Sequence, residues 1–297
     1  MNWKTKAFFQ RCLSALPAGG HVNYLCQRFV SRRMPQTDGT FQRRVAWARR
    51  HLDGMRIHLR RPFSSGAFLE FGAGQDLTGP LAFWALGVER QWLLDIEELM
   101  RPSLVNDTIR RFQRLSPFLR LSRLPEREIS SANRGALNDL ERIYGIEYRA
   151  PVDARKTGLA TASVDCVTST DVLEHLPPED IEAILRECRR VLSEGGLLSV
   201  RIDYQDHYAY ADPDITVYNF LQYSAEDWRR YNSSLQYQNR LRHRDYLEMF
   251  ARTPLDLLGQ ETEGGANGIS GVRIDRAYRK YTTTELAVRN AFVALRR

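Results

Sequence analysis

The 297-residue chain has few cysteines and no long run of apolar residues. No stretch approaches the ~20 apolar residues that a membrane-spanning helix needs, and the basic amino end lacks the apolar core of a signal peptide. The four cysteines, Cys12, Cys26, Cys166 and Cys188, lie far apart and form no CxxC pair, which disfavours a zinc site or a disulfide framework. We therefore predict a cytoplasmic protein with reduced thiols.

Internal repeats, low-complexity tracts and a complete dinucleotide-binding loop are also absent. A Gly-x-Gly-x-x-Gly loop would need a third glycine where Leu77 follows Gly72 and Gly74, which disfavours a nicotinamide-dependent enzyme. Apolar residues make up 43% of the chain and charged residues 27%, a composition typical of a globular chain that buries a full core. The default expectation is therefore an ordered protein.

Acidic residues are scarce at the amino end. Residues 1–61 hold 13 Lys or Arg against Asp38 and Asp53, a balance of +11, whereas residues 62–297 carry −4. Such a segment suits an anionic partner, such as a membrane surface, an acidic substrate or nucleic acid, or else forms a solvated helical face. Apolar residues at helical spacing between 41 and 55 predict an amphipathic helix within it. We predict a basic helical extension over 1–61 and one main domain over 62–297.

Strand-like and helix-like patterns alternate from residue 67 to residue 202. Short apolar segments followed by segments with helical spacing are typical of βαβ units, and the apolar segment 197–202 suits a central parallel strand. The stretch 117–138 is basic and is predicted to be irregular. The predicted strands cover 67–71, 91–95, 146–152, 164–169 and 197–202, and the predicted helices cover 77–86, a region through Phe112, and 178–192, which Gly195 and Gly196 would end.

A glycine-containing loop carries the clearest chemical signal. Gly72 and Gly74 lie where the first strand passes into a helix, and the missing Cβ atoms allow a ligand to approach the backbone. Asp95 ends the next strand, where a carboxylate can bind two ribose hydroxyls. Glu70 would repel a pyrophosphate but tolerates an ammonium group. The glycines alone could mark a tight turn, and the addition of Asp95 favours a nucleoside site.

These residues resemble the class I S-adenosylmethionine (SAM)-dependent methyltransferases, and the resemblance covers about Phe68–Asp203. Residues 170–177 have the sequence TDVLEHLP, which resembles the segment after the fourth strand in the type 11-like branch that acts on small molecules, lipids and glycans. Residues 191–198 match the following helix-to-strand turn, and 290–295 suit a last antiparallel strand. The resemblance implies an α/β, Rossmann-like sheet of seven mostly parallel strands, helices on both faces, an antiparallel last strand and an α-helical amino-terminal extension.

The resemblance also implies a SAM-binding site. Glu70 and the glycine loop would surround the methionine portion, Asp95 would bind the ribose, and Asp153 would bind the adenine amino group. Asp76 stands where the family often has a small residue, and we expect it to cap the following helix. The candidate cofactor-binding residues are Glu70, Gly72, Ala73, Gly74, Asp95, Ile96, Asp153, Ala154, Asp171 and Val172.

Residues at about 204–250 exceed what the core fold needs, and they are rich in aromatic rings. These rings would either stack on a sugar or pack a lid, so the segment is a candidate substrate-binding insertion. A sugar hydroxyl has a high pKa and benefits from a base. His207, just after the fifth strand, is the first candidate, and His175 and Asp171 follow.

A divalent metal is not predicted. Asp203, Asp206 and His207 could collect one, but the spacing does not locate the other oxygen ligands that it would need.

The acceptor is predicted from the family branch, the aromatic insertion and the cationic amino end. Together they favour an O-methyltransferase of polysaccharide biosynthesis that acts on a saccharide or lipid-linked glycan at the inner membrane face, with residues 1–61 touching anionic lipid. The segment 169–172 lacks the Asn-Pro-Pro-Tyr type of motif of base-methylating enzymes, which disfavours nucleic acid. Two alternatives stay open: a methyltransferase of phenols, quinone-type compounds or carboxylates, and a catalytically silent SAM-fold binding protein. The intact Glu70, Gly72, Gly74 and Asp95 set disfavours the silent protein.

Overall fold

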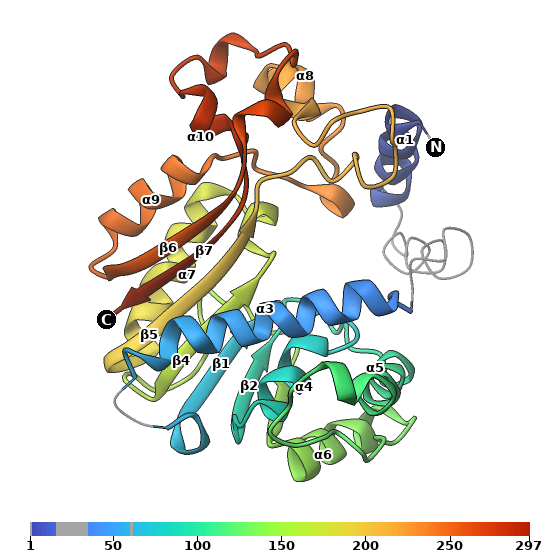
Figure 1. The fold of residues 1–297 in the computed structure, drawn as a ribbon, viewed down its shortest axis with the longest axis vertical. Helices are drawn as coiled ribbons and strands as arrows, with labels where there is room; N and C mark the ends of the chain where they lie inside the picture. Colours follow the sequence, from blue (N-terminus) through green and yellow to red (C-terminus); the bar gives the residue numbers. More distant parts are fainter. Residues whose placement is uncertain (1, 16–34, 60–61) are drawn as a thin grey trace.

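A seven-stranded sheet forms the centre of the computed structural model, which describes residues 2–15, 35–59 and 62–297. Its strand order is β3-β2-β1-β4-β5-β7-β6, and β7 runs antiparallel to both neighbours while the other pairs are parallel (Figure 1). This confirms the predicted Rossmann-like sheet with an antiparallel last strand. The strands are β1 (Ala67–Phe71), β2 (Arg90–Leu94), β3 (Ile146–Arg149), β4 (Val164–Thr170), β5 (Leu192–Asp203), β6 (Asp256–Gly264) and β7 (Val288–Arg296).

Two hydrophobic cores cover the two faces of this sheet, because successive residues of a strand point to opposite sides. Phe68 and Leu197 join the core beneath helices α3 to α6, whereas the next residues, Leu69 and Leu198, join the core beneath α7 and α9. The helices of these layers are α3 (Asp38–Arg56), α4 (Thr78–Ala85), α5 (Pro102–Leu115), α6 (Asn133–Tyr144), α7 (Pro178–Val191) and α9 (His243–Arg252).

Two local predictions were wrong. The stretch expected to be irregular gives way to helix α6 at Asn133, because Ala136, Leu140 and Tyr144 recur every four residues and bury one face. The glycines expected to end α7 lie inside β5 instead. Gly195 has φ +74°, and the pairing of β4 with β5 shifts register between Val164 and Cys166, so the strand continues through an irregularity.

A third hydrophobic cluster forms a cap, defined here as α1 (Trp3–Ser14) with residues 204–242 and 265–287. Strand β5 runs directly into this cap (Figure 1). Trp3 packs among rings of the insertion, with its centroid 4.6 Å from that of Tyr231 and 5.4 Å from that of Tyr208, and its backbone N–H donates to Asp212. Most insertion rings are therefore buried packing residues, and Tyr210, 51% exposed, is an exception.

Short helices complete the cap and the connections. They are η2 (Phe63–Ser65), η3 (Ser116–Phe118), η4 (Leu173–His175), η5 (Asn219–Gln222), α8 (Ala225–Arg229), η6 (Ser234–Gln236), η7 (Ala266–Ile269), η8 (Arg276–Tyr278) and α10 (Thr283–Ala287).

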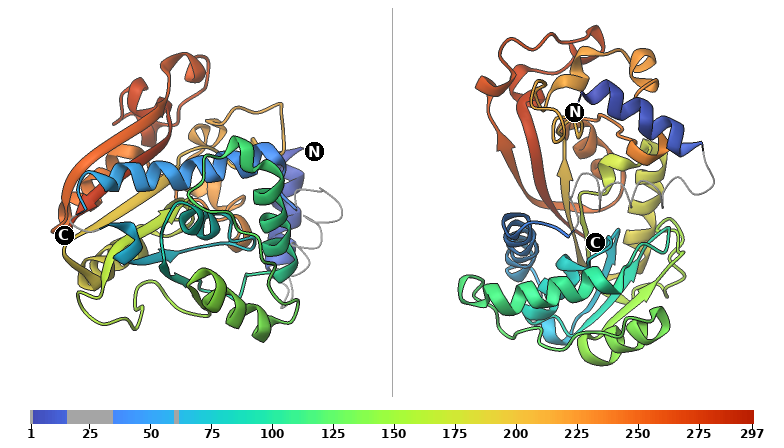
Figure 2. Two further views of the ribbon diagram at one scale, coloured as in Figure 1. Left: turned by 60° about the horizontal axis from the view of Figure 1, so that its bottom comes forward. Right: turned by 90° about the vertical axis from the view of Figure 1, so that its right-hand side faces the viewer.

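The two described helices of the amino-terminal extension pack in different places. Helix α1 joins the cap, whereas α3 lies along the main domain (Figures 1 and 2). The apolar side of α3 is buried as its spacing predicts, and Arg50 forms ion pairs with Glu261 and Glu263. Much of its positive charge therefore faces the protein itself. Cys26 lies outside the described residues, and within them no helix has the length and apolar content needed to cross a bilayer.

Candidate functional site

The glycine loop after β1 has the geometry that a ligand-binding turn needs. Gly72 and Gly74 both have φ +76°, a region that disfavours residues with a Cβ. A Cβ on Gly72 would come within 2.4 Å of Val172 Cγ2, so close packing against the loop after β4 requires glycine there. A Cβ on Gly74 would meet no described atom within 4 Å. Gly74 thus borders open space, where a ligand can approach the backbone.

Glu70 and Asp95 place two buried carboxyl groups beside this loop. Neither Glu70 Oε2 nor Asp95 Oδ2 accepts a hydrogen bond from any residue that the structure describes. Burial, together with the nearby Asp95, raises the pKa of Glu70 to about 8. Burial also raises the pKa of Asp95 to about 7, although the Tyr148 hydroxyl and the Ala73 backbone oppose it.

These orphaned buried oxygens fit the SAM site that the sequence resemblance implies. Buried acceptors without partners are unfavourable, and hydroxyl donors or a cationic group would compensate them. SAM offers both, through its ribose and its ammonium group. Sequence reasoning missed Tyr148, whose hydroxyl also accepts from the backbone of Leu99 at 3.1 Å. Tyr148 could have been found from the strand register, because Tyr148 of β3 pairs with Leu93 of β2, two residues before Asp95.

The predicted adenine-side residues lie near Asp95 but differ from one another. The backbone N–H of Val152 donates to the carbonyl of Asp95 at 2.8 Å, which brings the loop after β3 beside the end of β2. Both carboxylate oxygens of Asp153 accept from Arg155, which holds the pKa of Asp153 below its ordinary value. Ala154 packs against the core beneath α7, and the Ile96 side chain is 62% exposed. Ile96 is therefore accessible, whereas the Asp153 carboxylate is already paired.

Asp171, the first residue after β4, forms a partly buried ion pair with Arg201 of β5. It adopts the left-handed conformation, with φ +56°, and its N–H donates to the carbonyl of Arg201. The guanidinium of Arg201 lies 3.8 Å from the ring centroid of Trp47 in α3. Burial raises the pKa of Asp171 above its ordinary value, although Arg201 opposes it. Sequence reasoning missed Arg201 and Trp47, and the available signal was an arginine inside an apolar strand.

The two candidate histidines come together after β4 and β5. Their ring centroids lie 4.9 Å apart, and His207 Nε2 is 3.4 Å from Asp203 Oδ2. Although burial acts to raise it, hydrogen bonds from His207 and Tyr210 hold the pKa of Asp203 below its ordinary value. The Nδ1 atom of His175 hydrogen-bonds the Tyr237 carbonyl at 2.7 Å, and burial lowers the pKa of His175 to about 4.

A cavity of about 860 Å³ lies at the carboxyl ends of β4 and β5. Its walls come from the start of α3, the glycine loop, α5, the two strand ends and the edge of β6 and β7. Asp171 and Asp203 line this cavity, but His207 and His175 do not. His207 instead stacks on Tyr210, which does line it.

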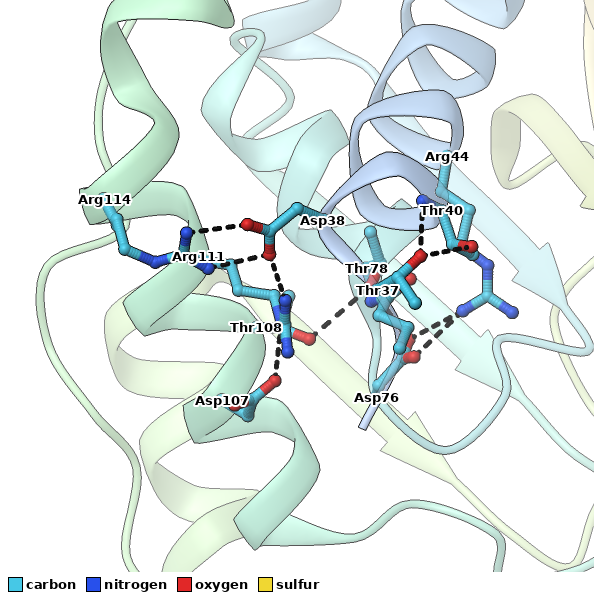
Figure 3. Close-up of polar contacts among 11 residues, drawn as sticks. Thr37, Asp38, Thr40, Arg44, Asp76, Thr78, Asp107, Thr108, Arg111 and Arg114 are labelled. Atoms are coloured by element: carbon cyan, nitrogen blue, oxygen red, sulfur yellow. Dashed lines mark hydrogen bonds and ion pairs between the residues drawn. The ribbon is translucent and has the colours of Figure 1, made fainter. Parts of the chain in front are cut away.

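Ion pairs hold α3 against the rim of this cavity (Figure 3). Asp38 pairs with Arg111 and Arg114 of α5, and Arg44 pairs with Asp76 at 2.9 Å. Asp76 also accepts from the backbone N–H of Thr78 at 3.1 Å. Asp76 thus bonds the first residue of α4 from one position before the N-cap, which is Leu77 and not, as the sequence predicts, Asp76, and it also ties the glycine loop to α3.

Comparison with protein families identifies the chemistry. Residues 128–200 match the family described as "Methyltransferase domain", and the matched segment, about a quarter of the chain, contains Asp153, Asp171 and His175. The chain is a SAM-dependent methyltransferase. The methyltransferase's glycine loop and Asp95 lie before the matched segment. No curated protein matches the chain in a sequence search.

Solved structures of low sequence identity resemble the methyltransferase. A putative methyltransferase from Bacillus halodurans is 15% identical with a TM-score of 0.43, over 83% of this chain and 97% of that one. The geranyl diphosphate C-methyltransferase from Streptomyces coelicolor is 13% identical with a TM-score of 0.46, over 85% and 77%. A SAM-dependent methyltransferase from Mesorhizobium loti is 15% identical with a TM-score of 0.44, over 82% and 96%.

Proposed function

We propose that the enzyme transfers the methyl group of SAM to a hydroxyl of a saccharide or lipid-linked glycan. The polar lining of the cavity beside the glycine loop carries this proposal. Carboxylates, side-chain amides and the Trp47 ring face the same space, and such a lining offers a hydroxyl-rich acceptor more hydrogen-bonding groups than an apolar acceptor could use. The carboxylates are Asp76, Asp107, Asp171, Asp203 and Glu263, and the amides are Gln36, Gln205 and Asn290.

The cofactor would be held by the loops after β1, β2, β3 and β4. We assign the methionine end to Glu70 and the glycine loop, and the ribose to Asp95, because these carboxyl groups contain the orphaned oxygens. Ile96 and the Asp153–Ala154 segment would border the adenine, and the Asp171–Val172 segment would close the site against Gly72. SAM supplies an electrophilic methyl group, so the chain must position the acceptor oxygen and remove its proton.

Asp171 is our candidate for the residue that takes this proton. It lines the cavity, its side chain is 27% exposed, and its raised pKa makes the carboxylate a better base near neutral pH. This changes the order predicted from sequence, where His207 stood first, because His207 lies behind Asp203 and Tyr210. We assign His207 a positioning role, through its contact with Asp203. His175 donates to a backbone carbonyl and faces no acceptor space.

We further propose that α1 touches an anionic membrane. Phe8 is 65% exposed and Phe9 is 59% exposed, on a helix that also carries Lys4 and Arg11. Exposed rings beside basic residues are typical of helices that lie at a lipid interface. This location would bring the cavity to lipid-linked acceptors at the inner membrane face, as polysaccharide biosynthesis would require.

A transfer assay tests the acceptor proposal. Full-length enzyme with methyl-labelled SAM is offered free saccharides, lipid-linked saccharides, and phenols or quinols of similar size. We expect transfer to a saccharide oxygen, located by NMR of the product. Preference for a phenol would favour the small-molecule alternative, and no transfer to any saccharide would contradict the proposal.

Vesicle sedimentation tests the membrane proposal. The double variant Phe8→Ser/Phe9→Ser should bind anionic phosphatidylglycerol vesicles at least about tenfold more weakly than wild type, because two rings no longer enter the interface. The control is Phe118→Ser, which removes a ring that is 74% exposed in η3, away from α1. Equal binding of all three proteins, or no binding by wild type, would refute the contact.

A further inference from the structure

Three potential metal ligands converge beside the proposed active site without lining its cavity. Glu174 and His175 belong to η4, which follows β4, and His207 follows β5. One ligand atom from each side chain lies within 4.8 Å of the other two. Two separate segments of the chain therefore meet at a cluster of two imidazoles and one carboxylate.

Glu174 is the unexplained member of this cluster. Its side chain is buried, with the residue 3% exposed. Neither Oε1 nor Oε2 accepts a hydrogen bond from the residues in 2–15, 35–59 or 62–297. A buried carboxylate without a partner is strongly unfavourable unless it is protonated, paired or bound to a metal. A cation held beside it by the two imidazoles would compensate it in this position.

The two histidines are oriented as metal-binding imidazoles usually are. The Tyr237 carbonyl can only accept, so Nδ1 of His175 carries the hydrogen and Nε2 keeps its free lone pair. Metal-binding histidines commonly donate their second ring N–H to a carbonyl in this way. The ring of His207 is held between Asp203, 3.4 Å away, and the stacked ring of Tyr210.

We propose that Glu174, His175 and His207 bind one divalent transition-metal ion, for which Zn²⁺ is the best-suited probe. Two imidazole nitrogens and one carboxylate oxygen are ligands that Zn²⁺ accepts, whereas Mg²⁺ prefers an octahedral set of oxygens. The ion links the loop after β4 to the start of the cap, next to Asp203. Its role is to fix these two segments relative to each other, and it does not depend on the identity of the acceptor.

The proposal departs from the sequence prediction, which favoured no metal and offered Asp203, Asp206 and His207 as the alternative set. The structure places Asp206 elsewhere, since its Oδ2 accepts from Asn219 at 2.8 Å and its Oδ1 from the backbone of Tyr208. The spacing of Asp203, Asp206 and His207 along one segment suggested a set that the fold does not assemble.

Metal titration tests the site in the full-length protein. After treatment with a chelator, the protein is titrated with Zn²⁺ in competition with a chromophoric chelator. We expect one ion per chain, and at least about tenfold weaker binding in Glu174→Gln and His207→Ala. His58→Ala, which removes a histidine after α3, should bind like wild type. Circular dichroism checks that the variants are folded.

Three outcomes would overturn the proposal: no Zn²⁺ bound by wild type, unchanged binding in folded Glu174→Gln and His207→Ala, or displacement of Zn²⁺ by millimolar Mg²⁺. Should the variants fail to fold, the visible absorption spectrum of wild type loaded with Co²⁺ still tests the ligand set. Four-coordinate Co²⁺ with nitrogen ligands gives strong visible absorption, and the lack of that band would contradict the assigned ligand set.

Discussion

The proposed cofactor half and the proposed acceptor half of the site are assembled in different ways. Glu70, the glycine loop and Asp95 come from two adjacent parallel strands and the loops that follow them. The cavity beside them needs α3, α5, the carboxyl ends of β4 and β5, and the β6–β7 edge. The first half depends on one βαβ unit, whereas the second depends on how distant elements pack.

The two halves also differ in how their charges are compensated. In the cofactor half, Glu70 and Asp95 each retain an orphaned oxygen and have raised pKa values. In the acceptor half, Asp171 is paired with Arg201, and Asp203 accepts from Tyr210. A bound ligand is therefore needed to supply hydrogen-bond partners to the carboxyl oxygens of the first half, while protein contacts already hold the carboxylates of the second. Substitutions should separate these two halves, and four experiments test this in order of decreasing effect.

The largest effect is expected from Asp171→Asn, which removes the proposed base and keeps the shape of the side chain. Turnover should fall about 10²- to 10⁴-fold, the usual contribution of general-base catalysis. The measurement is single-turnover methyl transfer with the acceptor that the screen identifies. Asp107→Asn, on the α5 wall of the cavity, is the matched control and should stay within about threefold of wild type. Comparable rates of methyl transfer in both variants would show that Asp171 is not the base.

Asp95→Ala should weaken SAM binding by about 1–3 kcal/mol, because charged hydrogen bonds to the ribose are lost. Asp153→Ala should weaken it by less than about 1 kcal/mol, since that carboxylate is already paired with Arg155 near the surface. Calorimetric titration with SAM and S-adenosylhomocysteine measures both. Equal losses of SAM affinity in the two variants would contradict the inference that Asp95, with its unpartnered oxygen, binds the ligand more strongly than Asp153 does.

SAM affinity should rise with pH between about 6 and 8. Without ligand the pKa is about 7 for Asp95 and about 8 for Glu70, and a ligand with hydroxyls and an ammonium group favours both ionised carboxylates. Binding is then strongest above the raised values and weakens as pH falls through them, by up to about tenfold per pH unit for each group. Titrations at several pH values measure this slope, which Glu70→Gln should reduce. A flat profile in wild type would show that these groups do not ionise on binding.

Trp47→Ala should affect the acceptor half alone. Loss of the ring over Arg201 removes a cation–π contact of about 1 kcal/mol and one wall of the cavity, so KM for the acceptor should rise about fivefold. Calorimetry should show unchanged SAM affinity. A parallel loss of SAM binding would mean that the two halves are not separable.

The accuracy of the sequence predictions follows the same division. Alternating strand and helix patterns located β1, β2, β4 and α7 because hydrophobic periodicity reflects which local face is buried, whereas β7 was expected from the family resemblance. Helix α6 was missed because only three of its residues, Ala136, Leu140 and Tyr144, are buried, which gives a weak periodic signal. The insertion was recognised by its rings, but their packing around Trp3 could not be foreseen, since the partner lies at the opposite end of the sequence.

The sequence alone determined the class of fold and the cofactor. Parallel strand ends meet at one edge of the sheet, so the glycine loop after the first strand and Asp95 after the second are brought together there. Only the tertiary structure decided that Asp171 lines the cavity while His207 lies behind it, and that Trp47 covers Arg201. The reason is physical: these positions depend on the packing of α3 and the cap against the sheet, and such long-range contacts leave no periodic signal in the residues that make them.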